Sequence, residues 1–440
     1  MFDPIATKLP STRSVERQEI LFLAHRFPYP PDRGDRIRSW NILRYLSSRA
    51  NISLACTTDS VISREQLNLV RSRCRRVLVA PLPPRRRWAN AGIHWLCGRS
   101  LTEGLFWSKN FAQTLDYWAD VITFDHVFVY CSSMLQYAQR PRLRSIPRVV
   151  DLVDVDSQKW KDYAQQAGPI HRLIYSSEAH RIARLERQSM ESSKAVLLAS
   201  NAEADLLRSQ IRNRRSAILG LSNGVDSEYF SAQWVDQDPC YSDRFNPTVP
   251  SELRIVFVGV LDYLPNIEGL RWFFSNIWME VRKQIPTATV HIVGKHPNAK
   301  IQAIVDYPGV NLVGAVEDVR PYLAAANVVI APLKIARGIQ NKVLEAMSMS
   351  KPLVLTSQAA EGIDATPDKH YVVADTAEQW IQNLVALAKT PEAAMEIGEA
   401  AREFVETEFN WNNRLESLDE IFGIASQTDE QEPLVPHEVF

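Results

Sequence analysis

The sequence lacks several features that define large classes of protein. No uninterrupted apolar run in its 440 residues approaches the roughly 18 residues that a membrane-spanning helix needs. The N-terminal segment MFDPIATKLPSTRSVERQEI has no apolar core of the kind found in secretion signals, so we expect a cytoplasmic protein. Five scattered cysteines form no C-x-x-C pair, which indicates reduced thiols rather than a disulfide framework or a zinc site.

Motifs for metals and common cofactors are also missing. The nine histidines form no H-x-x-x-H pair, and neither G-x-G-x-x-G nor G-x-x-x-x-G-K-[ST] occurs. We therefore expect no metal site and no resident cofactor, and we expect neither dinucleotide redox chemistry nor P-loop hydrolysis. The net charge of −1 gives no reason to expect a nucleic-acid partner.

Negative charge is absent from one long stretch. No acidic residue lies between Glu65 and Glu103, and the second half of this stretch also carries aromatic and aliphatic side chains. One interpretation is a solvated positive face. The other is a surface that docks onto an anionic membrane, with arginines for the headgroups and tryptophans at the interface. The stretch contains Arg71, Arg73, Arg75, Arg76, Arg85, Arg86, Arg87, Trp88, Ile93, Trp95, Leu96 and Arg99.

Short apolar runs alternate with amphipathic segments along the chain, a pattern typical of βα units on a parallel sheet. These runs are continuously apolar, as strands buried on both faces should be. The predicted strands of the first half are EILFLAH, ISLACTT, RVLVAPL, HVFVYCS, RVVDLVDV, AVLLAS and AILGLS. Those of the second half are RIVFVGV, TVHIVG, VNLVG, NVVIAPL, PLVLTS and YVVAD.

The length and one polar segment predict two domains. A chain of 440 residues exceeds one ordinary core. A polar, proline-containing segment without periodicity predicts a linker over residues 224–250. This division gives an N-terminal Rossmann-like domain over residues 18–223 and a second over residues 251–400, while residues 426–440 have the composition of a loose tail.

Glycines follow several predicted strands of the second half. Gly259, Gly294 and Gly314 each close a strand, and Gly338 precedes a predicted helix. Each glycine alone also fits an ordinary turn. Two doubly wound domains imply a cleft lined by the carboxyl ends of both sheets, and glycines there let the backbone approach a ligand closely.

Four segments of the second half resemble, in this order, the donor-binding half of the GT-B glycosyltransferases of family 4. They are VGVLDYLPNIEGLRWF, HIVGKHP, VNLVGAVEDVRPYLAAANVVIAPL and GIQNKVLEAMSMSKPLVLTSQAAEGI. The segment LSNGVDSEYF resembles the stretch in which the first domain of these enzymes leads into the second. ILFLAHRFPYPPDRGDRIRSWNILRYLSS and VVDLVDVDSQKW resemble bacterial sugar transferases associated with exosortase and PEP-CTERM exopolysaccharide systems.

This resemblance implies an α/β protein of GT-B type, with two Rossmann-like domains facing across a cleft and residues 401–425 packing back on the N-terminal domain. It also implies a nucleotide-diphosphate-sugar donor as substrate, retention of anomeric configuration and no required metal. In the family, the carboxylate that matches Glu345 binds the donor ribose, and the loop that ends in Gly34 reaches towards the donor phosphates. The predicted donor site comprises Glu345, Lys342, Arg337, Gly338, Asn341, Gly259, Gly294 and Gly34.

The sequence departs from the family pattern at three places. Related enzymes often have a catalytic histidine near VVDLVDVDS, where none occurs; Asp154, Asp156 and His25 are the remaining catalytic candidates, although the acids also fit helix caps and His25 also fits the core. The usual arginine and lysine are missing from GVLDYLPN, and Arg337 replaces the first glutamate of an E-x7-E pair. We predict that the cationic grip on the diphosphate has moved to Arg337 and Lys342.

The predicted function is transfer of a sugar from a nucleotide-diphosphate-sugar to a glycan or lipid-linked acceptor in exopolysaccharide synthesis. The protein would work in the cytoplasm or peripherally on the inner face of the membrane. Two alternatives stay open: a nucleotide-sugar epimerase of the same architecture, and a non-catalytic nucleotide-sugar-binding protein.

Overall fold

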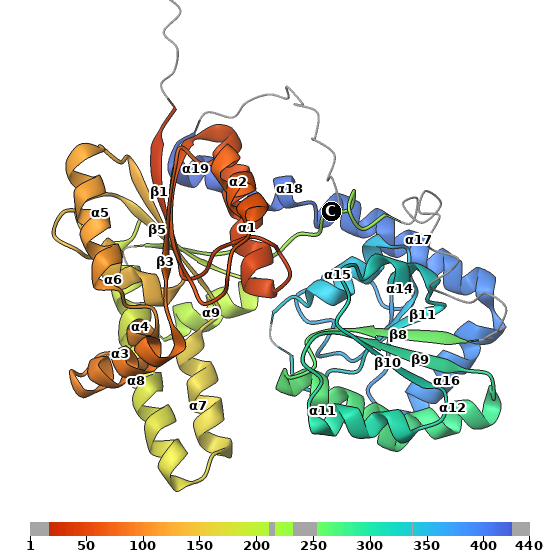
Figure 1. The fold of residues 1–440 in the computed structure, drawn as a ribbon. Coiled ribbons are helices and arrows are strands. Elements are labelled where there is room, and N and C mark those ends of the chain that lie inside the picture. The colour runs from red at the N-terminus through yellow and green to blue at the C-terminus, as the bar shows by residue number, and fades with distance from the viewer. Residues whose placement is uncertain (1–16, 211–215, 232–252, 337, 425–440) are drawn as a thin grey trace, which may run out of the picture. The chain divides into compact units, whose positions relative to one another are not determined.

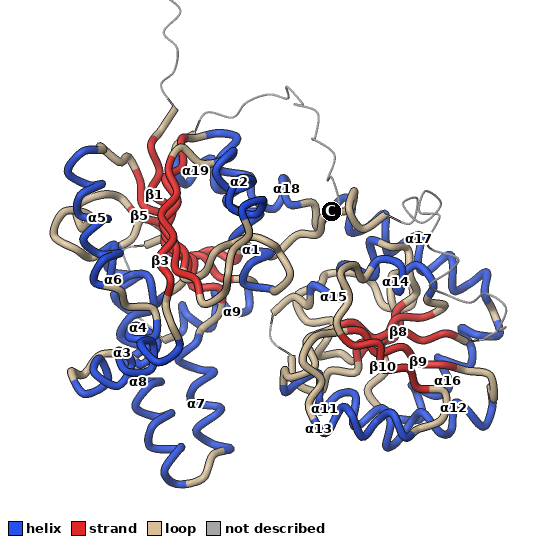
Figure 2. Tube along the Cα trace, viewed as in Figure 1, coloured by secondary structure: helices blue, strands red, loops and turns tan. Residues whose placement is uncertain are grey.

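The computed structural model describes residues 17–210, 216–231, 253–336 and 338–424. It contains two parallel sheets, one from each half of the chain, and helices accompany both (Figures 1 and 2). The predicted α/β architecture of two doubly wound parallel-sheet domains is confirmed, and every predicted apolar run contains a strand. The predicted linker lies outside the described residues from residue 232 to residue 250, and the predicted tail lies outside them entirely.

The first sheet belongs to the N-terminal half of the chain. Its strands are β1 (Glu19–Ala24), β2 (Asn51–Thr58), β3 (Arg76–Pro81), β4 (His126–Tyr130), β5 (Arg148–Val153), β6 (Ala195–Leu198) and β7 (Ala217–Gly220). The helices along this part are α1 (Gly34–Arg49), α2 (Arg64–Arg73), α3 (Pro84–Leu96), α4 (Leu101–Leu105), α5 (Lys109–Val121), η1 (Ser132–Met134), α6 (Leu135–Ala138), α7 (Asp156–Gln166), α8 (Pro169–Ser192) and α9 (Asn201–Ser209).

The strand order of the first sheet is β3-β2-β1-β4-β5-β6-β7. The order reverses between β1 and β4, so the connections leave these two strands in opposite directions and open a crevice at their carboxyl ends. Ala24, the last residue of β1, is in register with Tyr130, the last residue of β4. The residues that follow, His25 and Cys131, therefore leave the sheet together at this switch point.

The second sheet repeats this design in the C-terminal half. Its strands are β8 (Arg254–Val258), β9 (Thr289–Val293), β10 (Val310–Gly314), β11 (Val328–Ala331), β12 (Leu353–Leu355) and β13 (Val372–Val373), in the order β10-β9-β8-β11-β12-β13. Its helices are α11 (Leu264–Phe273), the π-helical turn η3 (Phe274–Trp278), α12 (Met279–Gln284), α13 (Ala299–Gln302), η4 (Ala303–Asp306), α14 (Arg320–Ala325), α15 (Asn341–Ser348), α16 (Ala377–Lys389), α17 (Pro391–Glu408) and α18 (Trp411–Leu415).

Two apolar layers cover the two faces of the second sheet. Along β8, Ile255 and Phe257 join the layer that contains Trp278 and Trp380, whereas Val256 joins the layer that contains Leu344. This alternation follows from the two-residue period of a strand, and both sets are buried. Because both faces are covered, the strands read as continuously apolar in the sequence.

The short helix α19 (Ser417–Phe422) contacts the first sheet although it lies near the C-terminal end of the described chain. The Phe422 ring meets His126 edge-on at 5.2 Å between centroids, and the amide of Gln18 donates to the Phe422 carbonyl at 3.2 Å. Asp419 pairs with Arg49 of α1 at 3.3 Å. Among the described helices, none combines the length and the apolar composition that crossing a membrane requires.

A fully buried ion pair joins α1 to β5. The guanidinium of Arg38 donates to both carboxylate oxygens of Asp151, from Nε at 2.7 Å and from Nη2 at 3.2 Å. Neither side chain has any exposed surface. The two parallel hydrogen bonds fix the rotation and the height of α1 over the sheet.

We expect Asp151→Ala to lower the free energy of unfolding by about 3–5 kcal/mol, because it removes a carboxylate that accepts two hydrogen bonds from the buried Arg38 guanidinium. Replacing both partners, Arg38→Met with Asp151→Leu, should recover most of this loss because no buried charge remains. Urea denaturation followed by tryptophan fluorescence measures both effects. Asp205→Ala is the control, since it breaks the exposed pair with Arg208 and should cost less than about 1 kcal/mol. Equal losses for Asp151→Ala and the double variant would contradict the prediction.

Candidate functional site

Two glycines bring the loops after β8 and β9 close together at the carboxyl ends of these neighbouring strands of the second sheet. A β-carbon at Gly294 would clash with the carbonyl oxygen of Gly259. A β-carbon at Gly259 would lie 2.8 Å from Nζ of Lys342 and 2.9 Å from Nδ2 of Asn266. Neither position has room for a side chain, so the glycines permit the approach of the lysine to the β8 loop.

Lys342 of α15 places a cation next to the loop after β8. This is the loop GVLDYLPN, in which the arginine and lysine usual in the family are missing. The ammonium of Lys342 donates to Oδ1 of Asn266 at 2.6 Å and lies 4.6 Å from the centre of the Phe257 ring. Burial lowers the pKa of Lys342 to about 7, although the carboxylate of Glu345 opposes this change. Burial likewise raises the pKa of Glu345 to about 7, against the effect of Lys342. The ammonium is therefore poorly compensated and would gain from a bound anion.

The N-terminus of α15 lies next to this lysine in the sequence. Gly338 has φ of +63°, a left-handed conformation that favours glycine, and the amide of Gln340 donates to its carbonyl at 3.1 Å. Within the described residues, Gln340 makes no side-chain cap bond to the helix. Asn341 begins the helix and accepts a bond of 3.0 Å from Asn223. Arg337, the other cation predicted here, lies outside the described residues.

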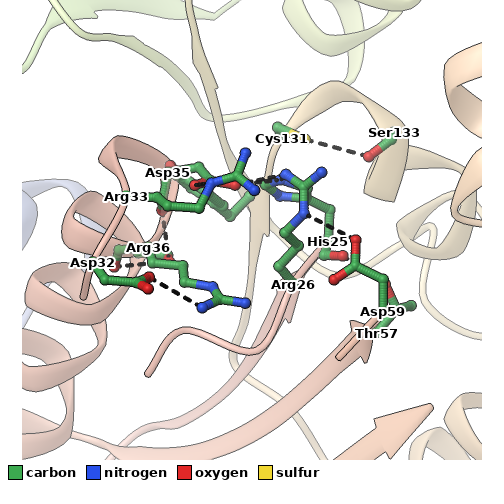
Figure 3. Close-up of polar contacts among 12 residues, drawn as sticks. His25, Arg26, Asp32, Arg33, Asp35, Arg36, Thr57, Asp59, Cys131 and Ser133 are labelled. Carbon is green, nitrogen blue, oxygen red and sulfur yellow. Dashed lines mark hydrogen bonds and ion pairs between the residues drawn. The ribbon is translucent and has the colours of Figure 1, made fainter. Parts of the chain in front are cut away.

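A second polar cluster forms at the switch point of the first sheet, around His25 (Figure 3). The main chain of His25 is held on both sides, by the Tyr130 carbonyl at 3.2 Å and by the Thr57 hydroxyl at 2.5 Å. The residue is 7% exposed, and Nε2 lies 3.3 Å from the Asp35 carboxylate. Arg26 shares this carboxylate at 2.6 Å.

The charges around His25 stabilise its protonated form. Burial would lower the pKa of His25, but the Cys131 thiolate and the Asp35 carboxylate outweigh it and raise the pKa to about 9. Burial would raise the pKa of Asp35, yet its contacts with His25 and Arg26 hold it well below its usual range. Gly34 is the first residue of α1 and places Asp35 in the first turn of that helix, where the helix dipole also favours a carboxylate.

Comparison with known proteins fits this arrangement. Residues 252–390 match the family described as "Glycosyl transferases group 1". The solved structure of Alr3699/HepE from Anabaena with UDP and glucose is 13% identical, with a TM-score of 0.64, and the alignment covers 92% of this chain and 100% of that chain. Sucrose-phosphate synthase from Thermosynechococcus elongatus is 16% identical, with a TM-score of 0.66 and coverage of 92% and 98%. The fold is GT-B.

Two further proteins are similar to this chain. WaaG, "a glycosyltransferase involved in lipopolysaccharide biosynthesis", is 15% identical, with a TM-score of 0.64 and coverage of 92% and 100%. A curated relative from Klebsiella pneumoniae, "Uncharacterized 44.6 kDa protein in cps region", is 21% identical over 42% of this chain. This chain spans about half of that relative, 54% of its length. Together with the family match, the GT-B fold supports a glycosyltransferase.

The predicted catalytic acids follow β5 of the first GT-B domain. Asp154 comes directly after the strand, and its amide donates to the Leu152 carbonyl at 2.9 Å. Asp156 begins α7, with its carboxylate 4.0 Å from the ammonium of Lys159. The acid that contacts His25 is neither of these but Asp35.

The sequence interpretation missed three residues that the structure brings to these sites: Asp35, Cys131 and Asn266. Asp35 had a usable signal, because it follows a glycine at a helix start on the loop after the first strand. Asn266 is 76 positions from the lysine it binds, so only the order of the strands reveals that contact. Gly314, also predicted near a ligand, ends β10 with φ of +80°.

We expect one histidine to titrate near pH 9, because the Asp35 and Cys131 charges stabilise the imidazolium of His25. Asp35→Asn should lower that pKa, and ¹⁵N-edited NMR of the histidine rings measures it. Asp32→Asn is the matched control, since Asp32 pairs with Arg36 at 3.1 Å. The folded pKa exceeds the unfolded value of about 6.5, so the stabilisation by this cluster is present below that value and is lost as the pH rises through 9. A His25 signal that titrates at or below the ordinary value would contradict the prediction.

Proposed function

We propose that this chain is a retaining, family 4 type glycosyltransferase that moves a sugar from a nucleotide-diphosphate-sugar to a glycan or lipid-linked acceptor in exopolysaccharide synthesis. The observation that carries the proposal is the half-buried, poorly compensated ammonium of Lys342 beside the start of α15, inside the segment that matches the glycosyltransferase family. The relative from a cps region and the bacterial sugar transferases that the sequence resembles support the exopolysaccharide role.

Each residue of this site has a role in the proposal. The main-chain N–H groups at the start of α15, with Gly338 and Asn341, face the diphosphate, and Lys342 neutralises it. Glu345, one turn further along, accepts hydrogen bonds from the donor ribose. Gly259 and Gly294 leave room for the donor to approach the backbone. The leaving diphosphate is stabilised by N–H groups and a fixed cation, so the proposal requires no metal, and activity should survive chelation with EDTA.

Proton uptake should accompany donor binding. In the free protein Lys342 has a pKa of about 7, and a bound diphosphate favours its charged form. At pH 8 the protein must therefore take up a proton when it binds the anion. The affinity should fall as the pH rises above about 7, because more of the free protein has lost that proton.

We expect Lys342→Met to weaken the binding of UDP about tenfold or more, since charge-assisted contacts to phosphate are the strong kind. Uridine, which lacks the phosphates, should bind as before. Glu345→Ala should weaken both ligands by about 1.5–3 kcal/mol, the scale of a hydrogen bond to a charged group. Isothermal titration calorimetry measures all three effects.

Lys351→Met is the matched control for these titrations. Lys351 is also half-buried, burial lowers its pKa to about 8, and its ammonium donates to the Ala324 carbonyl at 2.6 Å rather than facing the glycine loops. Equal losses for Lys342→Met and Lys351→Met would mean a general effect of removing a buried lysine and would contradict the assignment. Arg337 remains a prediction: Arg337→Glu should damage activity, because it sets a negative charge against the diphosphate.

A donor screen tests the reaction itself. The protein is incubated with UDP-, GDP- and dTDP-sugars, with and without lipid-linked glycan acceptors, and followed by NMR. Acceptor-dependent release of the nucleoside diphosphate, with the anomeric configuration retained in the product, is the expected result. Interconversion of the donor sugar without an acceptor would favour the epimerase. Binding without any turnover would favour a non-catalytic partner.

The proposal includes peripheral binding to an anionic membrane through α3. This helix presents its apolar residues to solvent: Trp88 is 67% exposed and Leu96 is 80% exposed. Two of its polar residues contact the protein instead: Arg87 pairs with Asp59 at 2.8 Å, and Asn90 donates to the Trp107 carbonyl. The exposed Arg85 flanks the apolar stripe and complements anionic headgroups.

We expect flotation with vesicles that contain phosphatidylglycerol, and we expect it to weaken at high salt because the arginine contribution is screened. Trp88→Ser with Leu96→Ser should abolish flotation. Val61→Ser is the control, because Val61 is 98% exposed but does not belong to α3. Equal flotation with purely phosphatidylcholine vesicles would contradict an anionic docking surface.

A further inference from the structure

Three neighbouring strands of the first sheet end at a small polar pocket. Strands β3, β2 and β1 lie side by side in that order and run parallel to one another. Their carboxyl ends therefore meet at one edge of the sheet, and the residues that follow them lie together. The lining of the pocket includes Arg26 after β1, Asp59 after β2, and Arg87 of α3 and Phe106 after α4, which both follow β3.

Two arginines share one carboxylate in this pocket. Nη1 of Arg87 donates to Oδ2 of Asp59 at 2.8 Å, and Nε of Arg26 lies 3.7 Å from the same oxygen. Both guanidinium groups also lie over the ring of Phe106, at 5.2 Å from its centre for Arg87 and 5.6 Å for Arg26. Phe106 is therefore an apolar floor under both arginines, and their N–H donors are left to polar partners.

The arginines here outnumber the carboxylates that pair with them. Arg26 also pairs with Asp35 at 2.6 Å, and Arg33 lies 3.5 Å from that carboxylate (Figure 3). Among the described residues, three arginines thus share two carboxylates. Within the same part of the chain, Nε of Arg26 and Nε of Arg87 are buried and have no hydrogen-bond acceptor. The excess positive charge and the unsatisfied buried donors both favour a bound anion.

Asp59 is the most accessible of the three charged groups in the pocket. Its side chain is 30% exposed, against 21% for Arg26 and 16% for Arg87. Burial would raise the pKa of Asp59, but both arginines lower it, so the carboxylate stays charged at neutral pH. The space between these residues is too narrow to hold an ion beside that carboxylate. An anionic ligand would therefore replace Asp59 between the two arginines.

The helix that carries Arg87 also carries the proposed membrane surface. Arg87 and Trp88 are consecutive in α3, and about 100° separates consecutive residues around a helix. Arg87 lines the pocket, whereas Trp88 is 67% exposed. An anion held by Arg87 would thus lie one residue away from the surface proposed to meet lipid. A phosphate that is attached to a lipid can reach both.

We propose that Arg26 and Arg87 form a clamp for the phosphate of a lipid-linked acceptor, and that Asp59 fills the clamp until the acceptor displaces it. Arginine suits this role because its planar group donates two parallel hydrogen bonds to phosphate oxygens. The inference rests on the proposed function and narrows it to acceptors that carry a phosphate or diphosphate next to the lipid.

Calorimetric titration with farnesyl diphosphate, a soluble lipid diphosphate, tests the clamp. All titrations use the Lys342→Met background, so that the diphosphate does not bind at the proposed donor site. Arg87→Gln should weaken binding about tenfold or more, because charge-assisted contacts to phosphate are strong. Asp59→Asn should strengthen binding at least about threefold, because it removes a competing negative charge. A gain of affinity cannot come from a damaged fold. Unchanged affinity in Arg87→Gln would overturn the clamp, and no gain in Asp59→Asn would overturn the displacement.

Controls identify the source of the affinity. Arg140→Gln should leave it unchanged, because Arg140 is also half-buried but pairs with Asp116 outside the pocket. Inorganic pyrophosphate should bind at least about tenfold more weakly than farnesyl diphosphate, since it lacks the methylene groups that α3 would cover. Trp88→Ser should remove most of that difference. Equal affinity for the two ligands would mean a pocket for free phosphate, and the lipid-linked part of the proposal would be wrong.

Kinetics with a lipid-linked acceptor separate this inference from the proposed function. In the otherwise native chain, Arg87→Gln should raise KM for the acceptor about tenfold and leave KM for the nucleotide-sugar unchanged. An unchanged acceptor KM with transfer intact would refute the clamp, while the glycosyltransferase would stand. If the native chain transferred no sugar from any donor, the proposed function would fail instead, and the titrations would still decide whether Arg26 and Arg87 bind a diphosphate.

Discussion

Arg38 and Asp151 carry opposite charges at a depth where neither side chain meets water. Each charge compensates the other through two parallel hydrogen bonds, which hold α1 and β5 at one spacing and one rotation. Asp35 lies on the same helix, nearly one turn before Arg38, and its carboxylate therefore reaches the ring of His25 at the end of β1. The pair thereby helps to hold Asp35 within reach of a histidine at the carboxyl end of a central strand.

The second sheet handles charge in the opposite way. The ammonium of Lys342 is half-buried and donates to the amide oxygen of Asn266 rather than to a carboxylate. Its nearest acid, Glu345, is itself raised in pKa by burial and compensates it only partly. The first sheet completes its ion pair and gains rigidity, whereas the second leaves an ammonium in need of an anion. Under the proposed function, the first charge is structural and the second binds the donor.

The architecture could be predicted from local sequence patterns. The arrangement of the candidate sites could not, because it depends on contacts between residues that are far apart in the sequence. Continuous apolar runs located every strand, and the glycines after β8 and β9 were expected where backbones approach closely. The sequence pattern could not show that Trp88 of α3 faces solvent while Arg87 faces the protein. That orientation depends on the ion pair of Arg87 with Asp59, the residue that follows β2. Nor could the pattern pair Cys131 with His25, since two apolar strands give no local sign of their neighbours. Roles assigned to Asp154, Asp156 and Glu345 remain predictions.

The position of α19 limits how this chain can be divided. Phe422 covers His126 and Phe128 of β4, and Asp419 neutralises Arg49, so the first domain is completed by residues that follow the whole second domain in the sequence. A fragment that stops at the linker would leave an aromatic surface on β4 bare and an arginine without its carboxylate. The first domain is therefore not contiguous in the sequence, and its synthesis ends only with the last described helix.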